Sequence, residues 1–369
     1  MSTLVIENLH VWYGDTHAVN DVSLRVEDGE LCVFLGPSGC GKTSTLRSVA
    51  GLVRPQSGRI LIDGQLVNDL YPGERDIAMV FQSYALYPHM TVREHWAFPL
   101  KALRVPKREM DQRIEEMANL LQMHDLLDRY PRSLSAGQAQ RVAIGRALIR
   151  KPRLWLLDEP LNSLDARLQV ETRAVLKRIQ RETGITTIYV THNQEEAQSL
   201  ADKIIIMNDG RIQQVGSPQE VYDEPVNLFV AGFVGTPPMN FLRCTVRREA
   251  ERAFLISGDL RLALRPDLAA RLQAEDGQEV ILGVRPEDVQ VLPICSEEPN
   301  GRLHARVFVL EPQGNEVIVS LHLPPDVLWK ARLDAKGVVT DLVSDQKVEL
   351  DLRQHRLHVF DAKTEARLL

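Results

Sequence analysis

The segment GPSGCGKT, residues 36–43, constrains the fold of this chain more than any other stretch. It fits the pattern G-x-x-x-x-G-K-[ST], and an apolar run, LCVFL, precedes it while a helix-like run, KTSTLRSVAGL, follows it. Glycines let backbone N–H groups turn toward phosphate oxygens, and the helix N-terminus adds partial positive charge. An incidental glycine-rich turn is the alternative, but a strand and a helix on the correct sides favour a phosphate-binding loop. The predicted nucleotide contacts are Gly36, Pro37, Ser38, Gly39, Cys40, Gly41, Lys42, Thr43 and Ser44.

Within that loop, Lys42 is expected to reach the β- and γ-phosphates, and the Thr43 hydroxyl to ligate Mg²⁺. A second acidic element is needed for the metal, and LWLLDEP, residues 154–160, supplies one at the end of an apolar strand. Asp158 is the candidate Mg²⁺ partner, and Glu159 is the candidate general base for an attacking water. Two solvated acids at a strand end are the alternative for this element taken alone.

Residues 1–235 alternate short apolar runs with longer amphipathic stretches, which predicts an α/β fold with a parallel sheet wrapped by helices. Residues of about 85–152 have helical character and no convincing strand, which indicates an inserted helical subdomain. After the segment FVGTPPMNFL, residues 236–369 contain short β-branched runs such as EVILGV, NEVIVSLHL and KVELDL. This last third is therefore predicted to be a small all-β domain, a barrel or a sandwich.

The composition narrows the class of partner. A formal net charge of −6 and a pI of about 6.0 give no overall attraction to nucleic acid, so none is expected as a partner. The four cysteines are scattered without a CxxC pair, which favours a reducing compartment over a zinc site or disulfide framework. The sequence has neither a signal-peptide pattern at its start nor an apolar run long enough to span a bilayer. Any membrane role is therefore expected to be peripheral.

Four other residues mean little alone. Gln82 and His192 each follow an apolar run, so each could lie at the sheet edge that holds the phosphate loop, or be a surface polar residue. Tyr13 could stack on an adenine ring, or be a half-buried strand aromatic. Asp165, in LNSLDA, reads by itself as an acid at a helix N-terminus.

The stretch LSAGQAQR, residues 134–141, has the spacing of a helix cap. Ser135 and Gln138 stand three residues apart, as in a capping box, and the helix-like run AQRVAIGRALI follows. Taken alone, this stretch predicts the start of a helix.

These pieces in this order resemble the nucleotide-binding subunit of ABC transporters. The correspondence places Walker A at Gly36 to Thr43, the Q-loop at Gln82, the signature at Leu134 to Gln138, Walker B at Leu154 to Asp158, the D-loop at Asp165 and the H-loop at His192. The segments GTPPMNFL, GVRPEDV and HVFDAKTEARLL extend the resemblance to the maltose and glycerol-3-phosphate type of sugar importer ATPase. That family implies an ABC-type α/β domain followed by an OB-like regulatory domain.

The resemblance also implies the chemistry and the partners. Two chains would sandwich two ATP molecules head to tail with Mg²⁺, and Ser135 and the Gly137 backbone N–H would hold the γ-phosphate bound to the partner's loop. Gln138 and Asp165 are further implied nucleotide contacts. Gln82 and Glu159 would place the water, Gln82 would also contact the metal, and His192 would hold the γ-phosphate. A helix start whose N–H groups need a cap is also an anion site, so LSAGQ is predicted to be both cap and half a binding site.

The chain departs from the family pattern at two places. Ala136 replaces the first glycine of the usual LSGGQ, and a helical backbone accepts alanine readily, so function is expected to be retained. LNSLDA exchanges the serine and asparagine of the usual LSNLDA. Both departures bear on the rate of hydrolysis and leave the family assignment unchanged.

The predicted function is the ATPase of a carbohydrate or polyol importer, peripheral on the cytoplasmic side of the membrane. Permeases would contact an apolar surface formed by Ala85, Leu86, Tyr87 and Pro88, for which packing inside the helical subdomain is the alternative. A solute-binding protein would be an indirect partner, and the paired ATPase could be a second copy or a paralogue. The alternatives are a polyamine, iron or sulfate importer ATPase, a soluble ABC ATPase, and a P-loop kinase with a small-molecule acceptor.

Overall fold

The structure is a computed structural model that describes residues 2–81, 85–162, 164–250, 252–258, 260–293, 303–324, 326–335 and 342–369. The chain forms two compact units, Met1–Gln219 and Glu220–Leu369. This division falls before the predicted one at residue 235, because residues of the intervening stretch pack with the second unit. For example, Ala231 shares a core cluster with Ile281 and Phe360.

The first unit contains two sheets. A six-stranded sheet has the order β10-β9-β3-β8-β7-β6, and a four-stranded sheet has the order β2-β1-β4-β5. The strands are β1 (Leu4–Tyr13), β2 (Thr16–Val26), β3 (Leu31–Leu35), β4 (Ser57–Ile62), β5 (Gln65–Leu66), β6 (Ile77–Val80), β7 (Leu154–Asp158), β8 (Thr186–Thr191), β9 (Lys203–Asn208) and β10 (Arg211–Gly216).

The larger sheet is parallel from β6 to β9, as the apolar runs predicted. The expectation of a parallel sheet is wrong for β1, β2, β4 and β5, which pair antiparallel. Only Gly14 and Asp15 separate β1 from β2, and a two-residue connection joins antiparallel strands.

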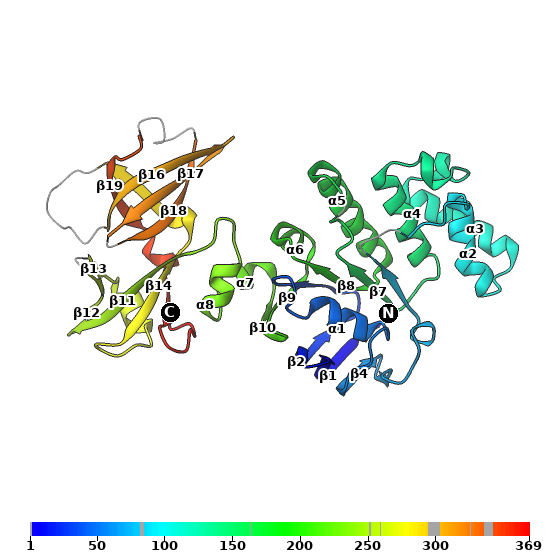
Figure 1. Ribbon diagram of the computed structural model, residues 1–369, viewed down its shortest axis with the longest axis horizontal. Helices are drawn as coiled ribbons and strands as arrows, with labels where there is room; N and C mark the ends of the chain where they lie inside the picture. The colour runs from blue at the N-terminus through cyan, green and yellow to red at the C-terminus, as the bar shows by residue number, and fades with distance from the viewer. Residues whose placement is uncertain are drawn as a thin grey trace. The chain divides into compact units, whose positions relative to one another are not determined.

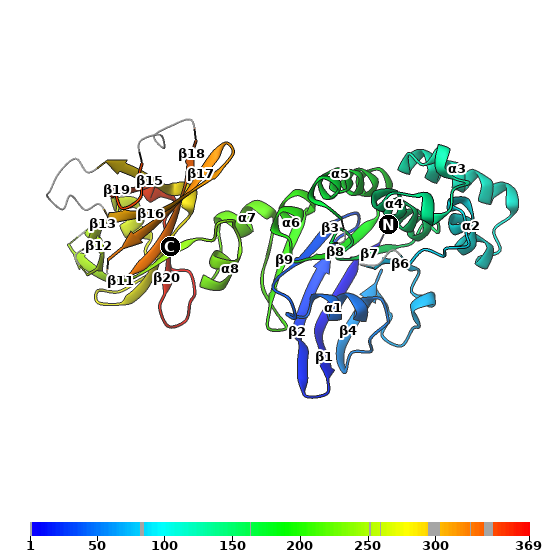
Figure 2. The same ribbon diagram turned by 45° about the horizontal axis from the view of Figure 1, so that its top comes forward.

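Helices divide into two groups around these sheets (Figure 1). The helix α1 (Lys42–Val49) contributes to the core between the two sheets, where Leu46 and Val49 join residues of β1, β3 and β7. The helices α5 (Ala166–Thr183) and α6 (Gln194–Leu200) follow β7 and β8. The other group comprises α2 (Val92–Ala102), α3 (Lys107–Leu121) and α4 (Ala136–Leu148), gathered beyond β6 in both views (Figure 2).

This second group occupies the stretch predicted to be a helical subdomain. Its described residues from 85 to 152 contain no strand. The helix α3 ends at Leu121 because Gln122 adopts the left-handed conformation with φ of 56°, and Met123 N then bonds to Ala118 O at 2.9 Å. Trp96 of α2 is buried and donates its indole N–H to Val142 O of α4 at 3.0 Å, which ties the two helices together.

The second unit is built of two antiparallel five-stranded sheets, with orders β13-β12-β11-β14-β20 and β15-β19-β16-β17-β18. One apolar core includes residues of both sheets, such as Val246 and Trp329. The elements are α7 (Pro218–Asp223), which spans the division, α8 (Leu228–Phe233), β11 (Asn240–Glu249), β12 (Arg252–Ser257), β13 (Leu260–Ala263), α9 (Pro266–Arg271), β14 (Glu279–Val284), β15 (Val289–Pro293), β16 (Leu303–Gln313), β17 (Glu316–Leu323), β18 (Val327–Asp334), β19 (Lys347–Leu352) and β20 (His358–Asp361).

His358 makes the stability of this unit depend on pH. It is buried on β20, and burial, aided by Arg367 and Arg285, lowers its pKa to about 3, against an ordinary 6.5. Between these values the unfolded chain binds the proton and the folded chain does not, so stability falls as the pH drops below about 6.5. We expect a loss of about 2 kcal/mol between pH 7 and pH 5 from this one group.

The variant His358→Gln should lack that component. Urea titrations at both pH values, with hydrogen exchange of the β14 and β20 peptides, measure the free energy of unfolding of this unit. The matched control is His304→Gln, because His304 is exposed on β16. An unchanged pH dependence in the His358→Gln variant would contradict the assignment.

Candidate functional site

The phosphate loop connects β3 to α1 and is shaped by glycines that tolerate close contacts. A Cβ on Gly36 would lie 2.3 Å from Met207 O, and Gly41 has φ of 104° with Ala18 O 2.4 Å from a hypothetical Cβ. Only glycine fits either position. The start of β2, close to Tyr13 at the end of β1, therefore lies against the loop, and the Tyr13 side chain is 47% exposed.

Lys42 is buried inside this loop. Its Nζ donates to Gly36 O and Pro37 O, both at 2.8 Å, and lies 3.6 Å from Cys40 Sγ. The loop carbonyls thus hold a positive charge beside the start of α1, where backbone N–H groups have no helical partner. This arrangement can attract a multiply charged anion.

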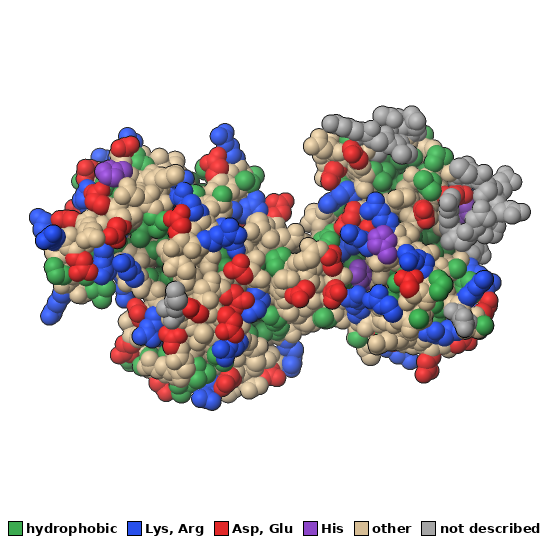
Figure 3. Space-filling model, turned by 180° about the vertical axis from the view of Figure 1, so that it is seen from behind, with side chains coloured by type: hydrophobic (Ala, Val, Ile, Leu, Met, Phe, Trp, Pro, Cys, Tyr) green, Lys and Arg blue, Asp and Glu red, His purple; other side chains and the backbone are tan. Residues whose placement is uncertain are grey.

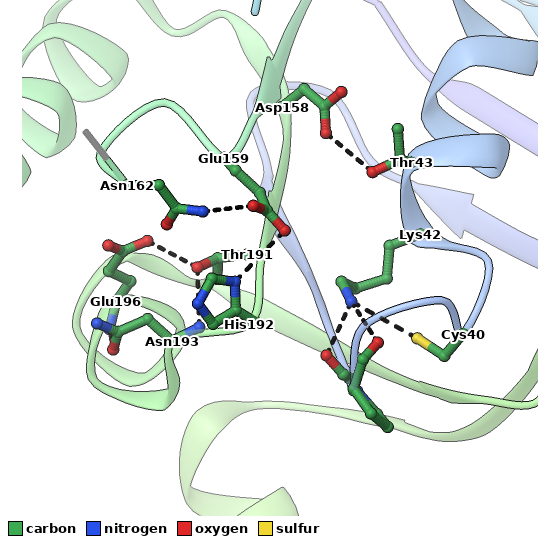
Figure 4. A network of polar contacts seen from close by, with 12 residues as sticks. Cys40, Lys42, Thr43, Asp158, Glu159, Asn162, Thr191, His192, Asn193 and Glu196 are labelled. Carbon is green, nitrogen blue, oxygen red and sulfur yellow. Dashed lines mark hydrogen bonds and ion pairs between the residues drawn. The ribbon is translucent and has the colours of Figure 1, made fainter. Parts of the chain in front are cut away.

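Asp158 faces the loop from the end of β7. The Thr43 hydroxyl donates to Asp158 Oδ1 at 3.1 Å (Figure 4). Arg47 Nη2 lies 4.0 Å from Asp158 Oδ2. Burial raises the pKa of the Asp158 carboxyl, an effect opposed by the Thr43 hydrogen bond and by Arg47. A hydroxyl and a buried carboxylate so close together are oxygen donors of the kind that Mg²⁺ prefers. The pair fits a magnesium ion.

Glu159 follows Asp158 and turns away from it. Its φ is 46°, a left-handed value that is unusual for a side chain other than glycine and is often found at functional sites. Glu159 Oε1 lies 3.4 Å from His192 Nδ1, and Asn162 Nδ2 donates to Oε2 (Figure 4). The structure therefore brings together Glu159 and His192, two residues that sequence analysis placed in one site.

A buried network of hydrogen bonds supports the loop that carries His192. Glu196 of α6 is 1% exposed, and its Oε2 accepts from Tyr189 OH and Thr191 Oγ1, both at 2.8 Å. Asn193 caps α6 by accepting from Glu195 N and Glu196 N, and its own N–H donates to Thr191 Oγ1 at 3.0 Å. The turn that presents His192 is thus fixed at both ends.

The signature stretch begins α4 as its spacing predicted. Ser135 and Gln138 form the capping box, with Gln138 N donating to Ser135 Oγ at 3.3 Å and Ser135 N to Gln138 Oε1 at 2.9 Å. Ala136 is the first residue of the helix, which agrees with its expected tolerance. Gly137 is buried beside Leu168 of α5. These residues make contacts within α4 and with α5.

Asp165 caps α5, as predicted, by accepting from Leu168 N at 3.0 Å. Gln82, for which a role at the metal and the water was predicted, lies outside the described residues. Pro37, Ser38, Gly39, Cys40 and Ser44 lie in or directly after the phosphate loop.

Three residues of the site, Asn162, Thr191 and Glu196, have no role predicted from the sequence. The sequence does contain a signal for Asn162. It follows Glu159 by three residues, and a β-turn brings residues at that spacing close together. Glu196 is one of two acids in HNQEEA, and only the fold shows that it is the buried one.

The predicted surface for a permease is exposed in part. Ala85, Tyr87 and Pro88 are exposed and Leu86 is half-buried. His95 Nε2 lies 2.8 Å from Tyr87 N, and Arg146 donates to Ala85 O at 2.8 Å. An apolar loop is thus anchored to α2 and α4 with Tyr87 40% exposed.

Family models match this chain along most of its length. A model described as ABC transporter matches residues 19–162, one described as MalK OB fold domain matches residues 235–289, and a TOBE domain model matches residues 282–360. No helix in the described part of the chain combines the length and apolar character needed to cross a bilayer.

Relatives are similar over their whole length. The trehalose/maltose import ATP-binding protein MalK of Thermococcus litoralis is 49% identical, over 96% of this chain and 96% of that protein. The oligosaccharides import ATP-binding protein MsmX of Bacillus subtilis is 41% identical over 100% of both. A solved structure of cbiO1 from Clostridium perfringens, part of the ABC transporter complex cbiONQ, is 31% identical, with a TM-score of 0.57 over 60% of this chain and 90% of that chain.

Proposed function

Because this chain belongs to the family of ABC transporter ATP-binding subunits, we propose that it hydrolyses ATP to drive the import of a carbohydrate or polyol. The observation that carries the solute class is the 41–49% identity, over nearly the whole chain, to subunits named for trehalose, maltose and oligosaccharide import. The matches of this chain's last third to the MalK OB fold domain and TOBE domain models support the same class. The chain would lie on the cytoplasmic face of the membrane, bound to permeases that receive solute from a binding protein.

The proposed chemistry assigns one role to each group at the sheet edge. Lys42 and the loop N–H groups hold the β- and γ-phosphates, and Tyr13 stacks on the adenine. Thr43 and Asp158 hold Mg²⁺, which when bound neutralises phosphate charge. Glu159 accepts a proton from the attacking water at its carboxylate, and His192 donates to the γ-phosphate.

Uptake of labelled sugars by cells tests this function. Replacing Lys42 by Ala should abolish both phosphate release by the purified chain and uptake of trehalose or maltose by cells that carry the variant, because the main cation of the loop is lost. Replacing Tyr87 by Ala should leave phosphate release within about twofold while uptake falls about tenfold or more, because truncating a central interface aromatic removes binding energy. Tyr71→Ala is the control for Tyr87→Ala, since Tyr71 is also exposed but lies outside the Ala85–Pro88 surface.

Two results would contradict the proposal in different ways. If the Lys42→Ala cells lose uptake of spermidine, iron or sulfate but take up sugars normally, the chain belongs to another class of importer. Normal uptake of every solute by the Lys42→Ala cells would favour a soluble ATPase without permeases. On the face drawn in Figure 3, acidic and basic side chains are interspersed, which gives no support to a nucleic-acid partner for such an enzyme.

A further inference from the structure

Asn162 stands in a turn whose position is fixed by a neighbouring helix. Its backbone N–H donates to Glu159 O at 3.4 Å, which closes the turn directly after β7. Gln140, buried on α4, donates its side-chain amide to Pro160 O at 3.0 Å. The turn is therefore held by α4, the helix that begins with the signature stretch. The turn brings Asn162 back beside Glu159, the residue at which the turn starts.

The side-chain amide of Asn162 bonds to one oxygen of the Glu159 carboxylate and makes no hydrogen bond to the other. Nδ2 donates to Oε2, while Oε1 faces His192 Nδ1 at 3.4 Å (Figure 4). The Glu159 side chain is 23% exposed and that of His192 is 50% exposed. An amide is a neutral donor, so it holds Oε2 without adding a charge to the site.

We propose that Asn162 is a positioning residue that fixes the Glu159 carboxylate through Oε2 and so keeps Oε1 directed at the water and His192. The inference rests on the role of Glu159 proposed above. The proposal also gives a function to the exchange of serine and asparagine in LNSLDA. The exchange places the side-chain amide of Asn162 three residues after Glu159, where the turn brings it back to the Glu159 carboxylate. Rotation of the carboxylate about its last side-chain bond would otherwise change which lone pair meets the water.

A purely structural contact that closes the turn is the competing explanation, and Asn162→Asp separates the two. Aspartate has nearly the shape of asparagine but sets a carboxylate against the carboxylate of Glu159, so the turn is kept and the restraint is lost. The matched control is Gln112→Glu, because Gln112 on α3 likewise donates its amide to a carboxylate, that of Glu116, at 2.9 Å but far along the chain from the site.

The experiment measures phosphate release at saturating Mg-ATP, ATP affinity and melting temperature of the full chain. Asn162→Asp should lower the turnover number about 10-fold or more, with ATP affinity and melting temperature equal to those of the Gln112→Glu chain. Asn162→Ala should lower turnover less, since it removes the donor without adding charge. In chains that already carry Glu159→Gln, Asn162→Asp should change the residual turnover less than about twofold, because the two residues act through one carboxylate.

The outcomes separate this inference from the function on which it rests. If Glu159→Gln lowers turnover strongly and Asn162→Asp lowers the residual rate of that chain by its full factor, the two effects are independent and Asn162 is not the positioning residue. A loss of turnover matched by a loss of melting temperature would show a structural role and overturn the inference. If Glu159→Gln leaves turnover unchanged, Glu159 is not the base and this inference fails with that assignment, while the import function is still decided by the uptake experiment.

Discussion

Replacing Glu159 by glutamine should lower ATP turnover by about 10²- to 10⁴-fold while ATP binding persists. The amide has nearly the size of the carboxylate and still fits between Asn162 and His192, but it cannot accept a proton from water. The groups proposed to bind phosphate, Lys42 and the loop backbone, are unchanged. Phosphate release at saturating Mg-ATP gives the turnover, and titration with a fluorescent nucleotide gives the affinity.

Glu171→Gln is the control for this experiment. Glu171 is an exposed acid on α5 that pairs with Arg167 at 3.1 Å, and its loss should leave turnover within experimental error. Turnover by the Glu159→Gln chain equal to that of the unaltered chain would remove Glu159 from the role of base. A loss of ATP affinity in step with turnover would instead assign it to nucleotide binding.

The parallel part of the fold was predictable because fully buried strands are short apolar runs. LCVFL and LWLLD became β3 and β7, each buried at every position. The antiparallel sheet of β1, β2, β4 and β5 was not predicted, although the Gly14–Asp15 connection is a hairpin signal. The alternation of apolar and helical stretches describes the parallel strands, whereas the hairpin signal is confined to the two residues between β1 and β2.

The candidate site was predictable at the positions where a sequence motif specifies the residue type. Lys42, Thr43, Asp158, Glu159 and His192 lie at one edge of the sheet because parallel strands end there together. The supporting contacts depend on turn geometry and burial, which a linear motif does not contain. Glu196 reaches Thr191 only because α6 begins one turn after β8 and buries that one acid of its first turn.

Substituting Ser135 by arginine should abolish ATP-driven pairing of two chains. Ser135 is exposed at the start of α4, and its contacts lie within its own capping box, so the groups proposed to bind this chain's nucleotide are left intact. In the head-to-tail pair of chains that the family resemblance implies, and that we propose forms on binding ATP, the N–H groups of this helix start face the γ-phosphate bound to the other chain. An arginine there occupies the space that the phosphate needs. Light scattering of the Glu159→Gln chain, with and without Mg-ATP, measures the mass.

A second substitution separates the lost cap from the lost interface. Ser135→Ala removes the capping hydroxyl at a cost of about 1 kcal/mol to the helix but adds no bulk, so pairing should weaken and still occur at higher protein concentration. If ATP doubles the mass of the Glu159→Gln chain and only the arginine prevents doubling at every concentration, LSAGQ binds the partner's nucleotide. If ATP binds and the mass stays that of one chain, this chain does not pair with itself in solution. The second half of its site must then come from a paralogue or form only on the permeases.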